Sequence, residues 1–239
     1  MGMTNNNDFI ADVLYREAIK EEKEWRKDKK NSHDIKIIDE ILKNARELGY
    51  GYKYFTDITN RDNTDIELLK LLLRYIGRFK DEWYSVALVR VIARKGNDFA
   101  TDTIINHYIN SSLENKSIHA CFYDNALSTI KDKRYVSAYL NFLKNPSEAT
   151  KFPKTMIMLG QWRIAEARTY FLKYINLIDL DDNHKWRTLV SVAIQALGYY
   201  NDDDGVILKA LEGKINMDDT IISSAVRKSM KKIKRQRDV

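Results

Sequence analysis

The chain has 239 residues but only 9 Gly and 2 Pro, against an average share of about 12% for the two together. A sheet-rich fold of this length needs many tight turns, which Gly and Pro usually form, so this composition excludes that class. Hydrophobic residues make up 44% of the chain, enough for a core, and the net charge of +6 combines 40 basic with 34 acidic side chains, so it indicates an anionic partner only weakly.

Three features of the sequence favour a cytoplasmic protein. Cys121 is the single cysteine, which excludes an intrachain disulfide and fits a reducing compartment. Residues 1–5 show neither the basic nor the apolar region of a secretory signal. Apolar runs stay far below the roughly 18 residues that span a bilayer, so we expect a soluble protein with no membrane partner.

The first 63 residues predict an irregular pair of helices. Apolar residues recur at three- and four-residue steps over residues 8–30, which indicates a first helix. Ser32 is a good N-cap for a second helix, and Gly49 stands where a left-handed residue would end it. Residues 50–55 predict a turn followed by one or two helical turns.

From Thr64 onward the chain predicts alternating helices. Thr64 and Glu67 have the spacing of a capping box before a helix that ends near Gly77, and residues 83–95 form the next helix. Pro153 lies inside an expected helix and predicts a late start or a bend there. The later helices are expected in pairs, at residues 100–109 with 118–130, 135–143 with 149–159, 164–175 with 186–197, and 206–211 with 221–233.

These helix pairs recur along the chain. If Lys95, Ile130, Leu159 and Leu197 are equivalent, the steps between them are 35, 29 and 38 residues. Paired helices that repeat every 20 to 50 residues are typical of an α-solenoid, in which stacked neighbours bury the apolar faces that no single pair can bury alone.

One stretch resembles a HEAT repeat in detail. The repeat begins with Ala-Leu-Gly at Ala196–Gly198, an acidic turn at Asp202–Asp203 and a Leu-rich first helix at Ile207–Leu211. It continues with an acidic cap at Asp218–Asp219 and a second helix that contains Val-Arg at Ala225–Lys228. The resemblance to bacterial HEAT-repeat proteins covers residues 64–235. It implies an all-α protein, a right-handed α-α superhelix of about five helical hairpins, continuous with an N-terminal helical cap at 1–63 and followed by a tail at 236–239.

The sequence contains no convincing catalytic constellation or glycine-rich phosphate loop. His107, His119 and Cys121 could form a zinc site, or they are rim histidines and a small buried cysteine. The acidic groups at residues 179–182 and 202–204 could bind a divalent metal, or they cap helices. We expect a protein that is not an enzyme and has no metal or cofactor.

The HEAT resemblance implies a binding surface, because the second helix of each pair usually lines the concave face. Polar side chains off the apolar stripe of these helices are therefore the candidates. They are Arg90, Arg94, Tyr123, Asn125, Lys154, Arg187, Gln195, Arg227 and Lys231. Trp83, Trp162 and Trp186 either pack between repeats or are exposed binding residues.

The strongest charge feature is the basic run from Arg227 to Arg237. It indicates either a patch for phosphates or an acidic protein, or simply the polar outer face of a terminal helix.

Most HEAT arrays are binding scaffolds, so the resemblance implies a non-catalytic protein that binds another protein on its concave face. An acidic partner is one form of this expectation, and a toxin-neutralising immunity protein is another. The alternative is a nucleic-acid-binding protein, at the extreme one similar to the alkylpurine DNA glycosylases. That activity would depend on Asp124 beside Tyr123, but the surrounding residues do not reproduce the aromatic-rich motif.

Overall fold

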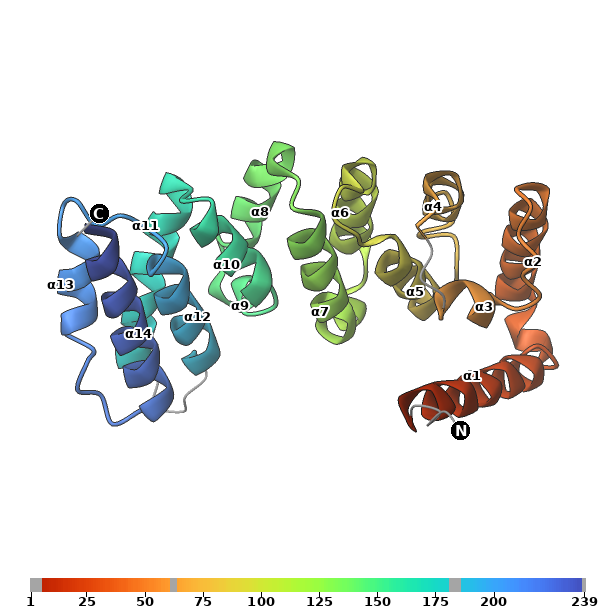
Figure 1. The fold of residues 1–239 in the computed structure, drawn as a ribbon, viewed down its shortest axis with the longest axis horizontal. Coiled ribbons are helices and arrows are strands. Elements are labelled where there is room, and N and C mark those ends of the chain that lie inside the picture. Colours follow the sequence, from red (N-terminus) through yellow and green to blue (C-terminus); the bar gives the residue numbers. More distant parts are fainter. Residues whose placement is uncertain (1–5, 61–63, 181–185, 238–239) are drawn as a thin grey trace, which may run out of the picture. The chain divides into compact units, whose positions relative to one another are not determined.

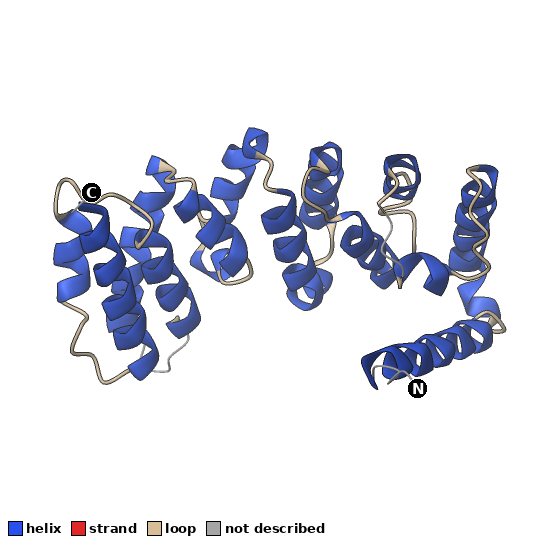
Figure 2. Ribbon diagram, viewed as in Figure 1, coloured by secondary structure: helices blue, strands red, loops and turns tan. Residues whose placement is uncertain are grey.

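The computed structural model describes residues 6–60, 64–180 and 186–237. Every regular element in these ranges is a helix and none is a strand (Figure 2), so the expected all-α class is confirmed. None of the described helices combines the length and the apolar character needed to cross a membrane. The chain divides into two compact units, residues 1–126 and 127–239, and the predicted boundary after residue 63 lies inside the first.

The first unit contains seven α-helices and two short 3-10 helices in its described residues (Figure 1). They are α1 (Asn6–Trp25), η1 (Lys29–Asn31), α2 (Ser32–Glu47), α3 (Phe55–Thr59), α4 (Ile66–Leu73), α5 (Glu82–Ile92), η2 (Asp98–Ala100), α6 (Thr101–Asn110) and α7 (Leu113–Ile130), which continues into the second unit. Helix α2 packs on α4, α4 on α5, and α3 on both α1 and α5.

Two predicted N-caps of this unit were wrong by one residue. Helix α2 begins at Ser32 itself, and Asn31 occupies the cap position without a side-chain bond. The cap of α4 is Asp65, whose carboxylate accepts from the Glu67 and Leu68 amides, rather than Thr64. A carboxylate is at least as good a cap as a hydroxyl and gains from the helix dipole.

The predicted stop at Gly49 is confirmed. Gly49 has φ +93°, a conformation that costs glycine little. Its amide donates to the Arg46 carbonyl at 2.9 Å, and the Tyr50 amide donates to the Ala45 carbonyl at 3.0 Å. This pair of bonds is the Schellman motif, which satisfies carbonyls that α2 leaves unpaired at its end.

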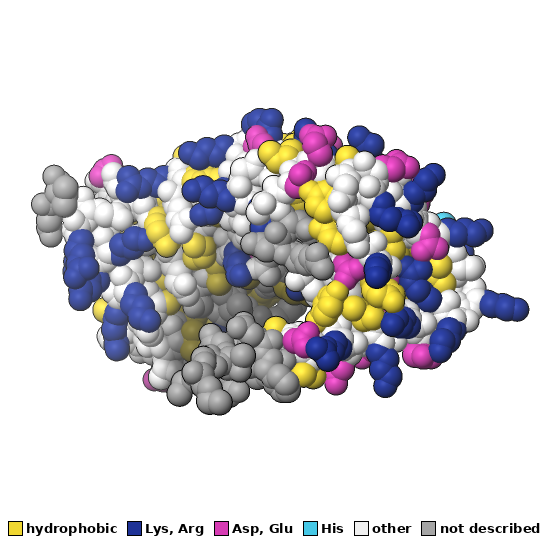
Figure 3. Space-filling view, turned by 45° about the vertical axis from the view of Figure 1, so that its right-hand side comes forward, with side chains coloured by type: hydrophobic (Ala, Val, Ile, Leu, Met, Phe, Trp, Pro, Cys, Tyr) yellow, Lys and Arg dark blue, Asp and Glu magenta, His cyan; other side chains and the backbone are white. Residues whose placement is uncertain are grey.

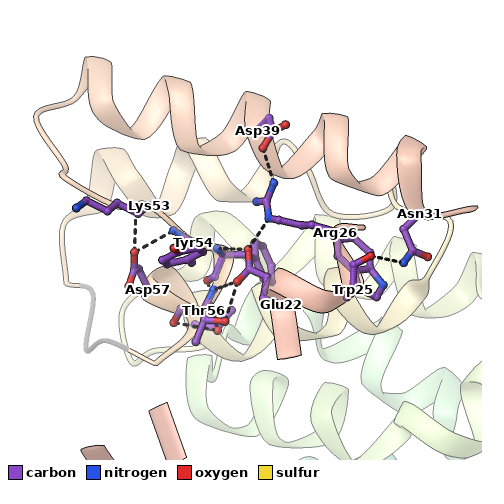
Figure 4. A network of polar contacts seen from close by, with 11 residues as sticks. Glu22, Trp25, Arg26, Asn31, Asp39, Lys53, Tyr54, Thr56 and Asp57 are labelled. Atoms are coloured by element: carbon purple, nitrogen blue, oxygen red, sulfur yellow. Dashed lines mark hydrogen bonds and ion pairs between the residues drawn. The ribbon is translucent and has the colours of Figure 1, made fainter. Parts of the chain in front are cut away.

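One buried carboxylate fastens α3 to α1 (Figure 4). Glu22 on α1 accepts bonds from the Phe55 amide at 3.0 Å, the Thr56 amide at 2.9 Å and the Thr56 hydroxyl at 2.8 Å. Arg26 reaches Glu22 at 3.1 Å and Asp39 of α2 at 2.7 Å. A five-residue helix is too short to be stable alone, so these bonds to its free N-terminal amides hold it in place.

The second unit begins within α7 and continues with further helices in its described residues. They are η3 (Lys133–Tyr135), α8 (Val136–Phe142), α9 (Pro146–Ala149), α10 (Pro153–Gln161), α11 (Ala165–Tyr174), η4 (Ile175–Leu180), α12 (Arg187–Leu197), α13 (Val206–Glu212) and α14 (Thr220–Arg237). Helix α14 therefore runs two residues past the expected end of the array at residue 235. Helix α12 packs against α10, α11 and α14 (Figure 1).

The effect predicted for Pro153 is confirmed. The single helix expected at residues 149–159 is divided into α9 and α10, and Pro153 is the first residue of α10. Proline is well suited to that position because its missing amide would have no helical partner there.

Small residues bring α10, α12 and α14 into close contact. A β-carbon at Gly160 of α10 would lie 2.7 Å from the Ala196 carbonyl oxygen of α12. A β-carbon at Gly198, at the end of α12, would lie 2.9 Å from the Ser229 hydroxyl oxygen of α14. Both distances are shorter than an atom can tolerate, so the absence of a side chain sets the spacing of these three helices.

Polar bonds at a regular chain separation reinforce this packing. The Arg163 side chain donates to the Tyr199 carbonyl at 2.9 Å, and the Tyr200 hydroxyl donates to the Ile164 carbonyl at 2.7 Å. Arg168 pairs with Asp204 at 2.6 Å. Each of these bonds joins residues 36 positions apart, within the range of repeat steps expected from the sequence.

The acidic turn before α13 caps that helix, as the capping interpretation predicted. Asp202 accepts from the Ile207 and Leu208 amides at 2.7 and 2.8 Å, and Asp204 accepts from Val206 at 3.1 Å. The Arg168 guanidinium and the Val206 amide lower the pKa of Asp204 to about 2. In the other acidic group, Asp181 and Asp182 lie outside the described residues, as does the side chain of Asp179.

We predict that Glu22→Gln lowers the free energy of unfolding by about 1.5–3 kcal/mol, because an amide nitrogen would replace one oxygen that accepts from the α3 amides. The matched control is Glu21→Gln, an exposed neighbour on the same helix. Urea unfolding followed by circular dichroism measures both. Equal stability of the two variants would show that Glu22 does not hold α3.

Gly160→Ala is expected to destabilise the protein by about 1–3 kcal/mol, because its methyl group would force α10 away from α12. Gly213→Ala is the control, since a β-carbon there meets nothing closer than 3.8 Å and its backbone is helical. In the same unfolding measurement, the free energy of unfolding of the Gly213 variant should lie within about 0.5 kcal/mol of that of the parent. A Gly160 variant as stable as that would contradict the proposed close packing.

Candidate binding groove

Four of the predicted binding residues lie in the first unit, and three of them reach its surface. Arg90 is exposed on α5 and lies 5.6 Å from the centre of the Phe122 ring. Arg94 follows the end of α5 and is half-buried, with its side chain donating to the Val91 carbonyl at 3.3 Å. Asn125 is exposed on α7.

The fourth, Tyr123, is wrong as a binding residue because its side chain is 0% exposed. Its hydroxyl lies 2.6 Å from Nδ1 of His107 and within 3.4 Å of Glu82. Burial raises the pKa of the Tyr123 hydroxyl and lowers that of His107. The adjacent Asp124 is only 2% exposed, so a bound substrate could not reach its carboxylate.

The residues considered for a zinc site lie in different surroundings. His107 bonds to Tyr123, while His119 packs beside Trp83 and Phe122 at ring distances of 5.8 and 6.4 Å. Cys121 is exposed, contrary to the expectation of a small buried cysteine. Within the described residues, no three His, Cys, Asp or Glu side chains gather closely enough to hold a metal.

Of the three tryptophans considered as binding residues, Trp83 is 43% exposed, which favours the exposed interpretation for that residue. Trp162 and Trp186 are half-buried. The Trp162 ring packs 6.3 Å from that of Tyr139, which is the packing interpretation.

The other five predicted residues lie in the second unit, and two of them, Lys154 and Gln195, line a common groove. Arg187 pairs with Asp219 at 2.5 Å across the starts of α12 and α14. Arg227 and Lys231 lie outside that groove, in a separate shallow hollow on α14.

The groove crosses the end of α7 and helices α10, α12 and α14. It consists of two adjoining hollows of about 460 and 560 Å³, which share Ile157 and Gln195. The hollow nearer α7 is lined by Ser128, Lys131, Pro153, Lys154, Ile157, Met158, Gln161, Val192 and Gln195. The hollow nearer α14 is lined by Ile157, Ser191, Gln195, Tyr199, Thr220, Ile221, Ser224, Ala225, Lys228, Ser229 and Lys232.

Lys131, Lys154, Lys228 and Lys232 are the charged side chains among these lining residues, and no Asp or Glu is among them. The face drawn in Figure 3 carries both basic and acidic side chains. In the described part of the chain, Lys131, Lys228 and Lys232 form no ion pair with a carboxylate. These three lysines therefore carry positive charge that no described carboxylate pairs with.

The pKa of Tyr199 is lowered by a hydrogen bond and by this positive environment. Its hydroxyl accepts a bond from the Gln161 amide at 3.4 Å, and the Lys232 ammonium lies over its ring. The Gln161 bond and the charges of Lys232 and Lys131 together lower the pKa of Tyr199, whereas burial acts in the opposite direction. Nearby cations stabilise a phenolate, so they would also stabilise a bound carboxylate or phosphate.

Lys131 occupies a position that usually belongs to glycine. It follows the last residue of α7 with φ +60°, and its amide donates to the Leu127 carbonyl at 3.0 Å. A side chain in this left-handed conformation costs about 1–2 kcal/mol relative to the ordinary helical one. Lysine occupies this position despite the conformational cost, and its side chain lines the groove. This combination favours a role of the Lys131 side chain in binding.

Sequence reasoning missed Lys131, and it included Lys228 and Lys232 only in the basic run from Arg227 to Arg237, not among the concave-face candidates. The two cations of α14 are four residues apart, so they lie on one side of the helix, beside the buried positions Ile222, Ala225 and Val226. Arg227 and Lys231 occupy the other side of that same stripe. Helical periodicity therefore divides the cations of α14 into two sets, one on each side of the buried stripe. Only the packing of α14 on α12 shows which set lines the groove.

Comparison with protein-family models, with curated protein sequences and with solved structures gives no match to this chain.

We predict that Lys131→Gly leaves the free energy of unfolding unchanged or raises it by up to about 1 kcal/mol, because glycine adopts φ +60° without strain. The same variant should bind polyanions more weakly, since one of four cations is lost. Urea unfolding and the anisotropy titration described below measure the two effects. A clear loss of stability, or an undiminished affinity, would exclude this role for Lys131.

Proposed function

We propose that this chain is a non-catalytic interaction protein, a HEAT-like right-handed α-solenoid whose groove across α10, α12 and α14 binds a negatively charged segment of another protein. The observation that carries the proposal is the set of four groove lysines with no carboxylate among them. The toxin-neutralising role expected from the HEAT resemblance is a special case in which the acidic partner is a toxin.

The distribution of charge along the chain supports an anionic partner for the second unit. Residues 127–239 contain 20 Lys and Arg against 13 Asp and Glu, whereas residues 1–126 contain 20 against 21. The net positive charge of the protein thus belongs to the unit that contains the groove. Such an excess attracts an acidic partner over about a Debye length, roughly 8 Å at physiological ionic strength, and accelerates association.

The non-catalytic part of the proposal follows from the residues considered for chemistry. Asp124, the candidate of the glycosylase alternative, is buried next to Tyr123. Cys121 and His119 are two positions apart on α7 and so project in different directions. The exposed Cys121 thiol fits a reducing compartment such as the cytoplasm, which is the location we propose.

Nucleic acid is the second candidate partner. Lysine ammonium groups neutralise phosphates as well as carboxylates, and the groove hydroxyls of Thr220 and Ser224 can donate to phosphate oxygens. Binding of this kind weakens steeply with salt, in proportion to the number of phosphates neutralised.

The test is a titration of fluorescein-labelled poly-L-glutamate and of labelled single-stranded DNA, followed by anisotropy at about 50 and 200 mM salt. We expect poly-L-glutamate to bind, more weakly at the higher salt. The double variant Lys228→Glu and Lys232→Glu should weaken that binding at least about tenfold, or roughly 1.4 kcal/mol.

The matched control is Lys231→Glu with Lys234→Glu, which changes the same charge on the same helix outside the groove. We expect this variant to retain most of the affinity. Absence of binding to either polyanion at low salt, or an equal loss in the two double variants, would refute the groove as the binding site.

A further inference from the structure

We propose that the occupant of the groove is an amphipathic α-helix of the partner, with an apolar face flanked by acidic side chains. This inference rests on the proposed function and names the kind of segment that the groove takes. It depends on three features of the lining. These are its aliphatic side chains, two lysines spaced by one helical turn, and the lack of arginine among the described lining residues.

Three aliphatic side chains, which we call the apolar floor, line the groove among its serine, threonine and glutamine residues. Ile157 of α10 and Val192 of α12 are half-buried there, and Ile221 of α14 is 51% exposed. An exposed isoleucine among half-buried aliphatic neighbours gains free energy when an apolar partner covers it. A segment that carries only charge would leave this floor in water, so the floor favours a partner with apolar side chains of its own.

The lysines flank this floor at a spacing that suits a helix. Lys228 and Lys232 are one helical turn apart on α14, about 6 Å along its axis. Carboxylates at positions i and i+4 of a bound helix have the same spacing. Lys131 and Lys154 provide cations at the other end of the groove.

The length of the groove also fits a helix. The hollow nearer α14 is lined along that helix from Thr220 to Lys232, a rise of about 18 Å. An α-helix of about 12 residues has the same length. An amphipathic helix in an apolar groove is a recurring mode of peptide recognition.

The cations of the groove favour carboxylates over phosphates. No Arg is among the described residues that line it, although Arg is the residue that binds phosphate with two parallel bonds. Single-stranded nucleic acids also stack their bases on aromatic rings. The aromatic residue of this lining is Tyr199, and the Lys232 ammonium already lies over its ring.

The experiment compares three labelled probes on the full chain by fluorescence anisotropy. The first is a peptide of about 12 residues with leucines on one helical face and glutamates on its flanks. The second has the same composition in a scrambled order that removes the apolar face, and the third is single-stranded DNA. We expect the amphipathic peptide to bind at least about tenfold more tightly than the scrambled peptide, and to gain helical circular dichroism when bound.

Ile221→Ser removes part of the floor at an exposed site, so the fold should be retained. It should weaken binding of the amphipathic peptide about fivefold to tenfold and leave binding of poly-L-glutamate unchanged. The control is Val206→Ser, another exposed aliphatic residue of the second unit that does not line the groove. That variant should bind both probes as the parent does.

The outcomes separate this inference from the proposed function. If the scrambled peptide binds as tightly as the amphipathic one, or Ile221→Ser has no effect, the helical occupant is refuted while an anionic partner stands. Tighter binding of DNA than of the amphipathic peptide would refute it in favour of nucleic acid. If none of the probes binds at low salt, both proposals fail.

Discussion

The groove of this protein depends on the close approach of three helices. Gly160 against Ala196 and Gly198 against Ser229 leave no room for a β-carbon, so α10 and α12 approach at backbone atoms, and α12 and α14 approach at a small side chain. Side chains on these helices can then face one side in a constant register. Ile157, Gln195 and Lys228 come from three different helices, and they line one surface because those helices pack closely side by side.

Helix periodicity predicted the all-α class and most of the helices, because a helix that packs on its neighbours buries one stripe of apolar residues. It also located the C-terminal end of α2 at Gly49 and the late start of α10 at Pro153. Cap positions were less predictable, as Ser32 and Thr64 show. Several polar residues stand near each helix start, and the choice between them depends on the path of the preceding chain.

The binding residues were harder to predict than the helices. Periodicity separates a buried stripe from its flanks, but both flanks of α14 carry cations, and the contact with α12 decides between them. Tyr123 failed for a related reason. Its hydroxyl suggested a surface position, whereas the aromatic body is buried and the hydroxyl is satisfied by His107. Such partners come from distant parts of the chain and leave no local signal.

The regular separation of the polar bonds in the second unit bears on how the protein is made. Arg163 with Tyr199 and Ile164 with Tyr200 join residues only 36 positions apart, and contacts of such short chain separation favour fast folding. Helix α14 is synthesised after α10 and α12, and it provides Lys228, Lys232 and Ile221. If the groove binds a partner as we propose, a nascent chain cannot complete that site until α14 has emerged and packed.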